Sequence, residues 1–302
     1  STDEVLRRAD AACLAAGAGG RNRVQRYEPG NEDLRTEELR LQWVGRVESL
    51  LDSDALYLRA QMLMPISAAA GELPSYEILL GIDAPGEKIS PYEFVAALQR
   101  LGRSHELDLW VLRHTFAWLR ENWAVLDAIE SLSVNLSVAS LTHPAVISML
   151  RQALADASLP ARKLVFEITE SAAIQSFEAA ERFIVEMRRF GVGFSLDDFG
   201  SGFTSYAHLK RLSVDKLKID GSYVVDMCGN ASDLAIVKSM TDIAHTLGMQ
   251  VIAEWVESPQ ILEKLIEVGV DYAQGYAVHK PVRLSELVAP PDVTGDQSPA
   301  VS

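Results

Sequence analysis

Acidic, amide and lysine side chains recur at the ends of short apolar runs in this sequence. These end positions are Asn135, Glu167, Asp197 with Asp198, Lys218 with Asp220, Glu254 and Gln274, and a further apolar run contains Glu77. A single acid after a strand is usually a helix cap or a loop residue. Because such polar residues recur at the ends of most of the apolar runs, they favour a shared polar site.

The adjacent pair Asp197 and Asp198 indicates what this site could do. Burying several carboxylates without a cation is very unfavourable, and a hard divalent ion with oxygen ligands removes that cost. Two neighbouring aspartates could face different ions, or one of them could bridge two ions. Two metals in one site suit hydrolysis of a phosphate ester. Lys218, which lies in an apolar run, could hold the attacking water or offset charge in the transition state.

The elements that must position these residues alternate along the chain. Strand-like runs lie at 55–63, 76–82, 132–136, 164–168, 192–196, 216–219, 249–253 and 270–275, and helical patterns lie at 91–120, 144–157, 177–190, 231–247 and 259–268. Such alternation over this length predicts an α/β fold with a closed (β/α)8 barrel. An open dinucleotide-binding sheet is disfavoured because no glycine-rich loop follows the first strand. In a barrel the strand ends meet at one mouth, which would bring the polar residues together.

Composition excludes several classes of function. The 302 residues carry a net charge of −14, which argues against non-specific binding of a nucleic acid polymer. Two distant cysteines, Cys13 and Cys228, fit no metal spacing and favour a reducing, cytoplasmic compartment. No apolar run is long enough to span a bilayer, so no membrane segment is expected in this chain.

Seven stretches, in this order and spacing, resemble the EAL-domain family of cyclic di-GMP phosphodiesterases. They are the segments 77–80 (EILL), 134–137 (VNLS), 166–170 (FEITE), 196–202 (LDDFGSG), 214–220 (VDKLKID), 253–257 (AEWVE) and 271–276 (DYAQGY). The resemblance implies a TIM-like barrel with one antiparallel strand. It also implies two Mg²⁺ or Mn²⁺ ions per site and hydrolysis of cyclic di-GMP to linear pGpG.

The resemblance also implies a role for individual residues. The implied metal ligands are Glu77, Asn135, Glu167, Asp197 and Asp198. Lys218 would contact the attacking water, Glu254 would be a ligand or general base, and Glu170 would brace the loop after Asp198. Gln61, Asp220 and Gln274 would lie on the substrate side of the site.

The first segment of the chain carries a second, shorter resemblance. The residues ADAA at 9–12 and GRNRV at 20–24 resemble the C-terminal end of a GGDEF (diguanylate cyclase-like) domain. We therefore expect residues 1–33 to be a GGDEF-like remnant with its linker, 34–288 the EAL barrel, and 289–302 a disordered tail. Upstream GGDEF and sensor domains, attachment of the longer protein to a membrane, and a homodimer are further expectations from the resemblance.

Five positions depart from the family pattern, and the mildest is Ile78, because the signature reads Glu-Ile-Leu in place of Glu-Ala-Leu and keeps the acid. Gly81 replaces a usual arginine, Met62 a usual proline and Gln99 a usual glutamate, and His279 lies near a position often held by glycine. Loss of a charged contact at Gly81 predicts weaker binding of the ligand, by about 1.5–3 kcal/mol, unless Arg59 compensates. The alternatives to an active phosphodiesterase are a non-catalytic cyclic di-GMP receptor, a protein-interaction module, and an unrelated Mg²⁺-dependent barrel enzyme acting on carbon acids.

Overall fold

The computed structural model describes residues 43–67, 73–84, 86, 88–156, 158–202 and 206–287. The predicted GGDEF-like segment 1–33, the start of the predicted EAL barrel from residue 34, and the tail 289–302 lie outside these residues. The described chain divides into two compact units, which are treated separately below.

The smaller unit contains described residues 43–57 and 82–107. Residues 43–51 are helical, and α3 (Pro91–Leu101) begins with a capping box in which Ser90 and Glu93 satisfy each other's backbone amides. The helical pattern predicted at 91–120 is present, but it is divided into two helices. Gly102, at φ 69°, ends α3 in the left-handed conformation, and a second helix, α4 (Ser104–Glu121), follows.

The larger unit, residues 58–81 and 108 onward, contains almost all of a nine-stranded sheet. Its strands are β1 (Leu56–Pro65), β2 (Ser75–Ile82), β3 (Leu132–Asn135), β4 (Leu164–Thr169), β5 (Gly193–Phe199), β6 (Lys216–Ile219), β7 (Gln250–Ala253), β8 (Tyr272–Ala273) and β9 (Val282–Arg283). Strands β2 to β8 pair in parallel and in chain order. Strand β1 pairs antiparallel with β8 and also pairs with β2, which closes a ring of eight strands. The predicted TIM-like barrel with one antiparallel strand is confirmed.

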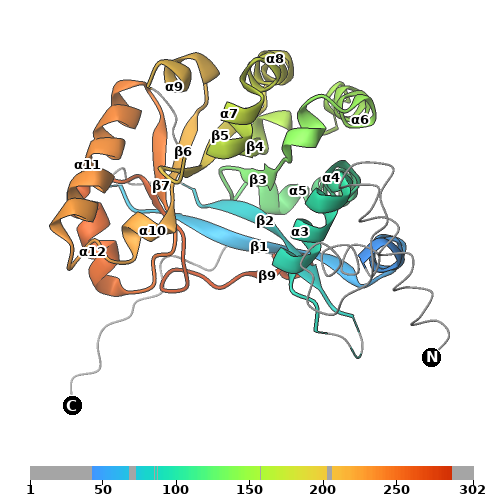
Figure 1. Ribbon diagram of the computed structural model, residues 1–302, viewed down its shortest axis with the longest axis horizontal. Coiled ribbons are helices and arrows are strands. Elements are labelled where there is room, and N and C mark those ends of the chain that lie inside the picture. The colour runs from blue at the N-terminus through green and yellow to red at the C-terminus, as the bar shows by residue number, and fades with distance from the viewer. Residues whose placement is uncertain are drawn as a thin grey trace, which may run out of the picture. The chain divides into compact units, whose positions relative to one another are not determined.

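Helices cover the outside of this ring (Figure 1). They are α5 (Trp123–Leu126), α6 (Pro144–Leu154), α7 (Glu170–Gln175), α8 (Phe177–Arg188), α9 (Tyr206–Leu212), α10 (Gly221–Val224), α11 (Ala231–Thr246) and α12 (Pro259–Val268), with 3₁₀ turns at Val138–Leu141, Ala161–Lys163 and Leu284–Glu286. The aromatic rings of Phe166, Phe183 and Phe194 pack α8 against β4 and β5, with ring centroids 5.9–6.4 Å apart. Strand β9 pairs with β1 outside the ring and was not predicted.

The interior of the barrel follows from the period of two in each strand. Leu63, Ile252 and Tyr272 form a separate buried apolar cluster on β1, β7 and β8. The residue two positions along each of these strands is polar: Gln61, Glu254 and Gln274. The side chains that fill the barrel and those that make the site are therefore successive layers on the same strands.

Candidate active site

Lys218 lies at the centre of the predicted site. It is on β6, its side chain is only 1% exposed, and its ammonium is surrounded by carboxylates from four other strands or strand ends. Its Nζ lies 2.8 Å from Glu254, 3.0 Å from Glu167, 3.0 Å from Asp197 and 3.3 Å from Glu77. Burial lowers the pKa of Lys218, but these carboxylates outweigh burial and hold the pKa well above its usual value. The lysine is therefore a cation whose charge compensates part of the buried acid cluster.

The acids around it are strongly affected by burial. Burial raises the pKa of Glu167 to about 7 and that of Glu254 to about 8, and neighbouring carboxylates add to both shifts. Burial acts on Glu77 in the same direction. There the charge of Lys218 and hydrogen bonds from Gln274 and Asn135 prevail, and the pKa of Glu77 is lowered. The single positive charge of Lys218 does not neutralise these carboxylates. A further cation in the site would therefore be stabilised by the remaining negative charge.

Three carboxylates form a group suited to a metal ion. One oxygen from each of Asp197, Asp198 and Glu254 lies within 4.8 Å of the others. Burial, Asp197 and Asp220 raise the pKa of Asp198 to about 6. The buried Oε1 of Glu167 has no hydrogen-bond partner among the described residues. A set of carboxylate oxygens with excess negative charge and an unpartnered acceptor fits a hard divalent cation.

Amide side chains extend the site along one side of the barrel. Asn135 donates to Oε1 of Glu77 at 2.6 Å, and Nε2 of Gln274 donates to its Oε2, also at 2.6 Å. The same Nε2 lies 3.2 Å from Oε1 of Gln61, and Nε2 of Gln61 donates to the carbonyl oxygen of His279 at 3.1 Å. The structure thus brings together Gln61, Glu77, Asn135 and Gln274, which the sequence placed on four separate strands.

The loop after Asp198 is held by Glu170, the first residue of α7. Its Oε2 accepts from the amides of Gly200 at 2.8 Å and Gly202 at 3.1 Å. Gly200 has φ 103°, and a Cβ there would lie 2.6 Å from the Cε of Met240. Glycine is therefore favoured at this turn chiefly because of its positive φ, since the end of the Met240 side chain can move aside.

Comparison with known proteins identifies the family. The model of the EAL domain matches residues 46–281. The chain belongs to the EAL-domain family. It is 35% identical over 286 residues to the cyclic di-GMP phosphodiesterase PdeB of Shewanella oneidensis. This alignment covers 94% of this chain and 33% of that protein. It is 34% identical over 246 residues to the cyclic di-GMP phosphodiesterase PdeF of Escherichia coli, with 81% and 32% covered.

Solved structures give the same assignment. The PaMucR phosphodiesterase in complex with c-di-GMP superposes with a TM-score of 0.75 at 29% identity, over 82% of this chain and 99% of that one. The FimX EAL domain from Pseudomonas aeruginosa bound to c-di-GMP superposes with a TM-score of 0.71 at 28% identity, over 79% and 96%. This chain spans about a third of the length of the curated relatives named above.

The EAL barrel carries two further features beside its acids. Asp220 caps α10 by accepting from the amide of Ser222 at 2.8 Å, and it lies close enough to Asp198 to raise its pKa. Trp255, directly after Glu254, has φ 54° and is 58% exposed, and its ring covers Gly221, where a Cβ would lie 2.2 Å away. The sequence did not single out Trp255, because it lies after the predicted strand 249–253, where periodicity does not indicate which side chains are exposed.

Arg59, which the sequence offered as compensation for Gly81, is bonded to a backbone carbonyl in this structure. Its guanidinium donates to the carbonyl oxygen of Pro281 at 2.7 Å, on the side of β1 that pairs with β9. The predicted compensation therefore has no support in this contact.

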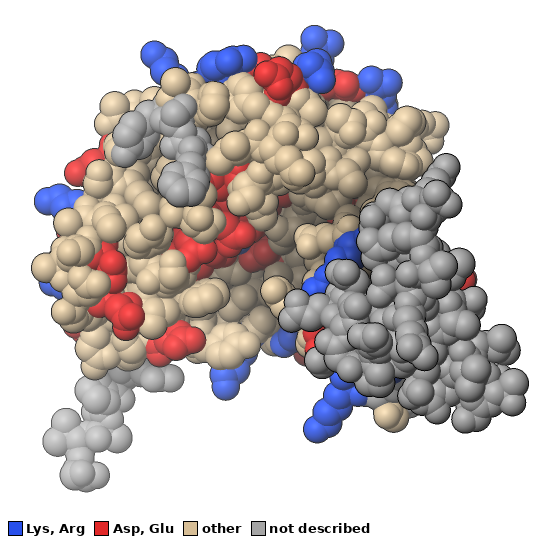
Figure 2. Space-filling view, in the orientation of Figure 1, with Lys and Arg blue, Asp and Glu red and all other residues tan. Residues whose placement is uncertain are grey.

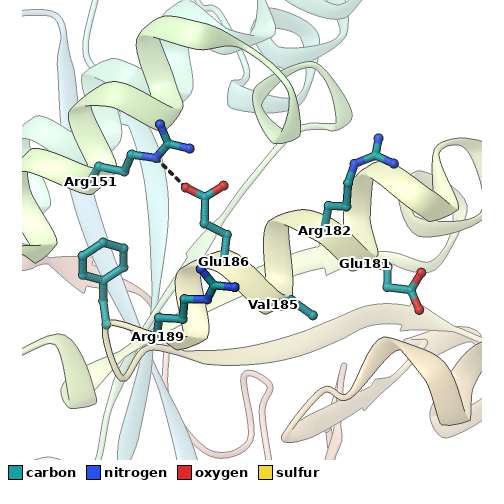
Figure 3. Close-up of a pocket in the computed structure, with 7 residues that line it drawn as sticks. Arg151, Glu181, Arg182, Val185, Glu186 and Arg189 are labelled. Carbon is teal, nitrogen blue, oxygen red and sulfur yellow. Dashed lines mark hydrogen bonds and ion pairs between the residues drawn. The ribbon is translucent and has the colours of Figure 1, made fainter.

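Charged residues elsewhere on the EAL barrel offer different chemistry. Acidic side chains gather toward the middle of the face in Figure 2, while lysine and arginine lie mostly around its edge. A surface pocket of about 730 Å³ on the helical layer (Figure 3) is lined by Arg151, Glu181, Arg182, Val185, Glu186, Arg189 and Phe190. Its acids have cationic partners: Arg151 lowers the pKa of Glu186, and Glu181 pairs with Arg211 at 2.8 Å. Such compensated surface charges do not provide the excess negative charge of the barrel interior.

Proposed function

We propose that this chain catalyses divalent-metal-dependent hydrolysis of cyclic di-GMP to linear pGpG. The observation that carries the proposal is the buried Lys218 ammonium among carboxylates from four strands, beside the group Asp197, Asp198 and Glu254. Membership of the EAL family and the two curated relatives named as cyclic di-GMP phosphodiesterases support the same reaction. In it, water adds to one phosphorus, one P–O bond to ribose breaks, and the second phosphodiester stays intact.

The metal ions are part of this proposal. Mg²⁺ or Mn²⁺, two per site, would be held by Glu77, Asn135, Glu167, Asp197 and Asp198, with Glu254 completing the acid group. When bound, the ions would supply positive charge at the phosphate and lower the pKa of a water.

The side chains have separate tasks in the reaction. Lys218 is a permanent cation and is placed to offset negative charge that develops at the phosphate. With its carboxylate ionised in the metal-loaded site, Glu254 would accept a proton from the attacking water; its contact with Lys218 and its place in the acid group support this role. Glu170 keeps the loop after Asp198 in place through the amides of Gly200 and Gly202.

Gln61, Asp220 and Gln274 are proposed to bind the nucleotide. Gln61 and Gln274 lie on the side of Glu77, whereas Asp220 lies beside Asp198. The two glutamines would therefore act beside Glu77, and the aspartate beside Asp198.

Asp198→Asn tests the proposal directly. Incubation of the unmodified chain with cyclic di-GMP and Mg²⁺ or Mn²⁺ should give pGpG, measured by chromatography. Asp198→Asn should lower turnover by about 100-fold or more while the fold is retained, because a charged metal ligand becomes neutral. Glu263→Gln, an exposed acid on α12, is the control and should leave turnover unchanged. Absence of pGpG with either metal at high protein concentration rejects the function.

Gly81 favours a second function, a cyclic di-GMP receptor without turnover. This β2 residue has no side chain with which to grip the ligand, in contrast to the arginine usual in the family. Calorimetry distinguishes the two functions: tight binding of cyclic di-GMP in EDTA, together with absent hydrolysis, supports the receptor. Neither binding nor hydrolysis would favour a protein-interaction module.

A further inference from the structure

The chain from β8 through segment 275–283, which includes β9, is bonded to β1 at successive points. Strand β9 pairs with Arg59 and Ala60, and β8 pairs with Met64 and Pro65. Between these two pairings, residues 61 and 62 of β1 are bonded to one residue of the segment, His279. His279 therefore contacts β1 at two neighbouring residues, one of which, Gln61, is a predicted site residue.

The imidazole of His279 acts as an acceptor. Its Nδ1 lies 3.4 Å from the backbone amide nitrogen of Met62, which donates to it. This contact requires a neutral ring with the proton on Nε2, and burial lowers the pKa of His279, which favours that form. The ring also meets the fully buried ring of Tyr76 edge-on, with centroids 6.3 Å apart.

The carbonyl group of the same residue leads into the site. It accepts from Nε2 of Gln61 at 3.1 Å, while Oε1 of Gln61 accepts from Gln274 at 3.2 Å. Turning the Gln61 amide over would place oxygen against oxygen and NH₂ against NH₂, so these two partners fix its orientation. Gln274 in turn donates to Glu77 at 2.6 Å. A continuous series of hydrogen bonds thus runs from His279 to a carboxylate of the acid cluster.

We propose that His279 is a positioning residue for Gln61 and, through Gln274, for Glu77. The bond from Met62 to the imidazole fixes segment 275–283 on β1, and the carbonyl of His279 then sets the orientation of Gln61. The donor exists because residue 62 is not a proline, and the acceptor exists because residue 279 has a side chain. Both positions are departures from the family pattern that meet in one contact. The kinetic consequence rests on the proposed phosphodiesterase function.

The test uses variants that remove either side of this contact. His279→Leu removes the acceptor at similar size, and Met62→Pro removes the donor. Each should raise KM for cyclic di-GMP about 3- to 10-fold with a smaller change in kcat, as expected for loss of one hydrogen bond on the substrate side. His279→Asn, whose Oδ1 can accept near the position of Nδ1, should recover most of the loss.

Coupling separates positioning from a general effect on folding. If the two residues act through one bond, the double variant Met62→Pro/His279→Leu should be no worse than the poorer single variant. In a Gln61→Ala background, His279→Leu should change KM less than 2-fold, because the group that it orients is already absent. Full additivity in either cycle, or failure of a folded His279→Asn to recover KM, overturns the proposal.

A measurement independent of turnover keeps this inference distinct from the proposed function. The amide of Met62 should exchange slowly with solvent deuterium in the unmodified chain and in His279→Asn, and faster in His279→Leu. Unchanged exchange at Met62 in His279→Leu overturns the proposal even in an active enzyme. If the chain binds cyclic di-GMP without hydrolysing it, the same variants should show the loss in the dissociation constant, and equal affinity across them overturns the proposal.

Discussion

At the scale of single residues, Lys218 is the position on which the charge of the site depends. Its ammonium lies within 3.3 Å of four carboxylates, so its removal leaves acids that burial already disfavours in their ionised form. The lysine therefore contributes to stability as well as to the proposed reaction.

Lys218→Met should destabilise the metal-free chain by about 3–5 kcal/mol, as expected when one partner of a buried ionic cluster is removed. The loss should be greater at higher pH, where Glu167 and Glu254 must ionise without their cation. Mg²⁺ should restore part of the stability by replacing the missing charge. Urea unfolding in EDTA and in Mg²⁺ measures both effects. Lys238→Met, an exposed lysine on α11, is the matched control, and equal losses for the two variants would contradict this account.

The sequence predicted which polar side chains come together in those cases where parallel strands position them. Asn135, Glu167, Asp197 and Lys218 were expected at one mouth, because successive parallel strands end there, and the structure places them together. The roles proposed for them stay predictions. The positioning contact of His279 could not be predicted, because it joins a loop residue to a backbone amide 217 positions earlier in the chain. Neither periodicity nor motif spacing contains that distance.

At the scale of elements, the chain after β8 lies so close to the chain after β7 that a side chain added at Gly275 should lower the stability of the fold. Gly275 follows Gln274, and a Cβ there would lie 2.2 Å from the carbonyl oxygen of Val256 and 2.3 Å from its nitrogen. These are backbone atoms that also bond to Gln274 and Ala277, so they cannot move independently.

Gly275→Ala should lower the free energy of unfolding by about 1–3 kcal/mol, because overpacking forces the backbone apart. It should also weaken the proposed hydrolysis, because Gln274 and the segment after it would shift. Gly229→Ala is the control, since its nearest neighbour lies 3.9 Å away, and it should change stability by less than about 0.5 kcal/mol. Chemical denaturation of the two variants decides, and a Gly275→Ala chain as stable as the control would show that residue 256 can give way.

Element boundaries show where sequence patterns lose information. The strands from 55–63 to 270–275 were predicted at nearly the right places because their apolar runs are continuous and separated by helices. A helical pattern was predicted over 91–120 without its interruption, since the apolar period continues past Gly102, and the structure divides there into α3 and α4. Strand β9 was missed because two residues carry no periodic signal, and its pairing is fixed by β1.

At the scale of the whole molecule, the acid cluster links stability, pH and metal. In the metal-free chain Glu254, Glu167 and Asp198 have pKa values of about 8, 7 and 6, above their unfolded values of 4.5, 4.5 and 3.8. The folded state therefore binds more protons than the unfolded state between about pH 4 and 8. Stability of the metal-free chain should fall as pH rises through this range.

Saturating Mg²⁺ should reverse this trend, because the ion replaces the protons on the carboxylates. The gain in Tm on adding Mg²⁺ should be larger at about pH 8 than at about pH 5.5, with each 1 kcal/mol worth about 2–4 °C. Thermal unfolding with Mg²⁺ and with EDTA at both pH values measures the difference. Asp198→Asn should reduce the gain, and an equal gain at the two pH values would show that these acids do not bind the ion.

At this scale the sequence predicted the fold but not its division into two units. The alternation of strands and helices predicted the barrel, and the described helices include none long and apolar enough to cross a membrane. The division into two compact units was not anticipated, because the smaller unit combines residues 43–57 with 82–107, which are separated in the chain by β1 and β2. Discontinuous units leave no boundary in composition or linkers.

The pairing of β1 with β8 and β9 has a consequence for synthesis of the protein. Met64 pairs with Ala273 and Arg59 with Arg283, so the first strand of the ring must wait for the last ones. Until β8 is available to pair with β1, any part of the sheet that has already folded would keep an open edge, and such edges favour association with other chains. The proposed catalytic centre, which needs Gln274 beside Glu77, can assemble only at the end of that process.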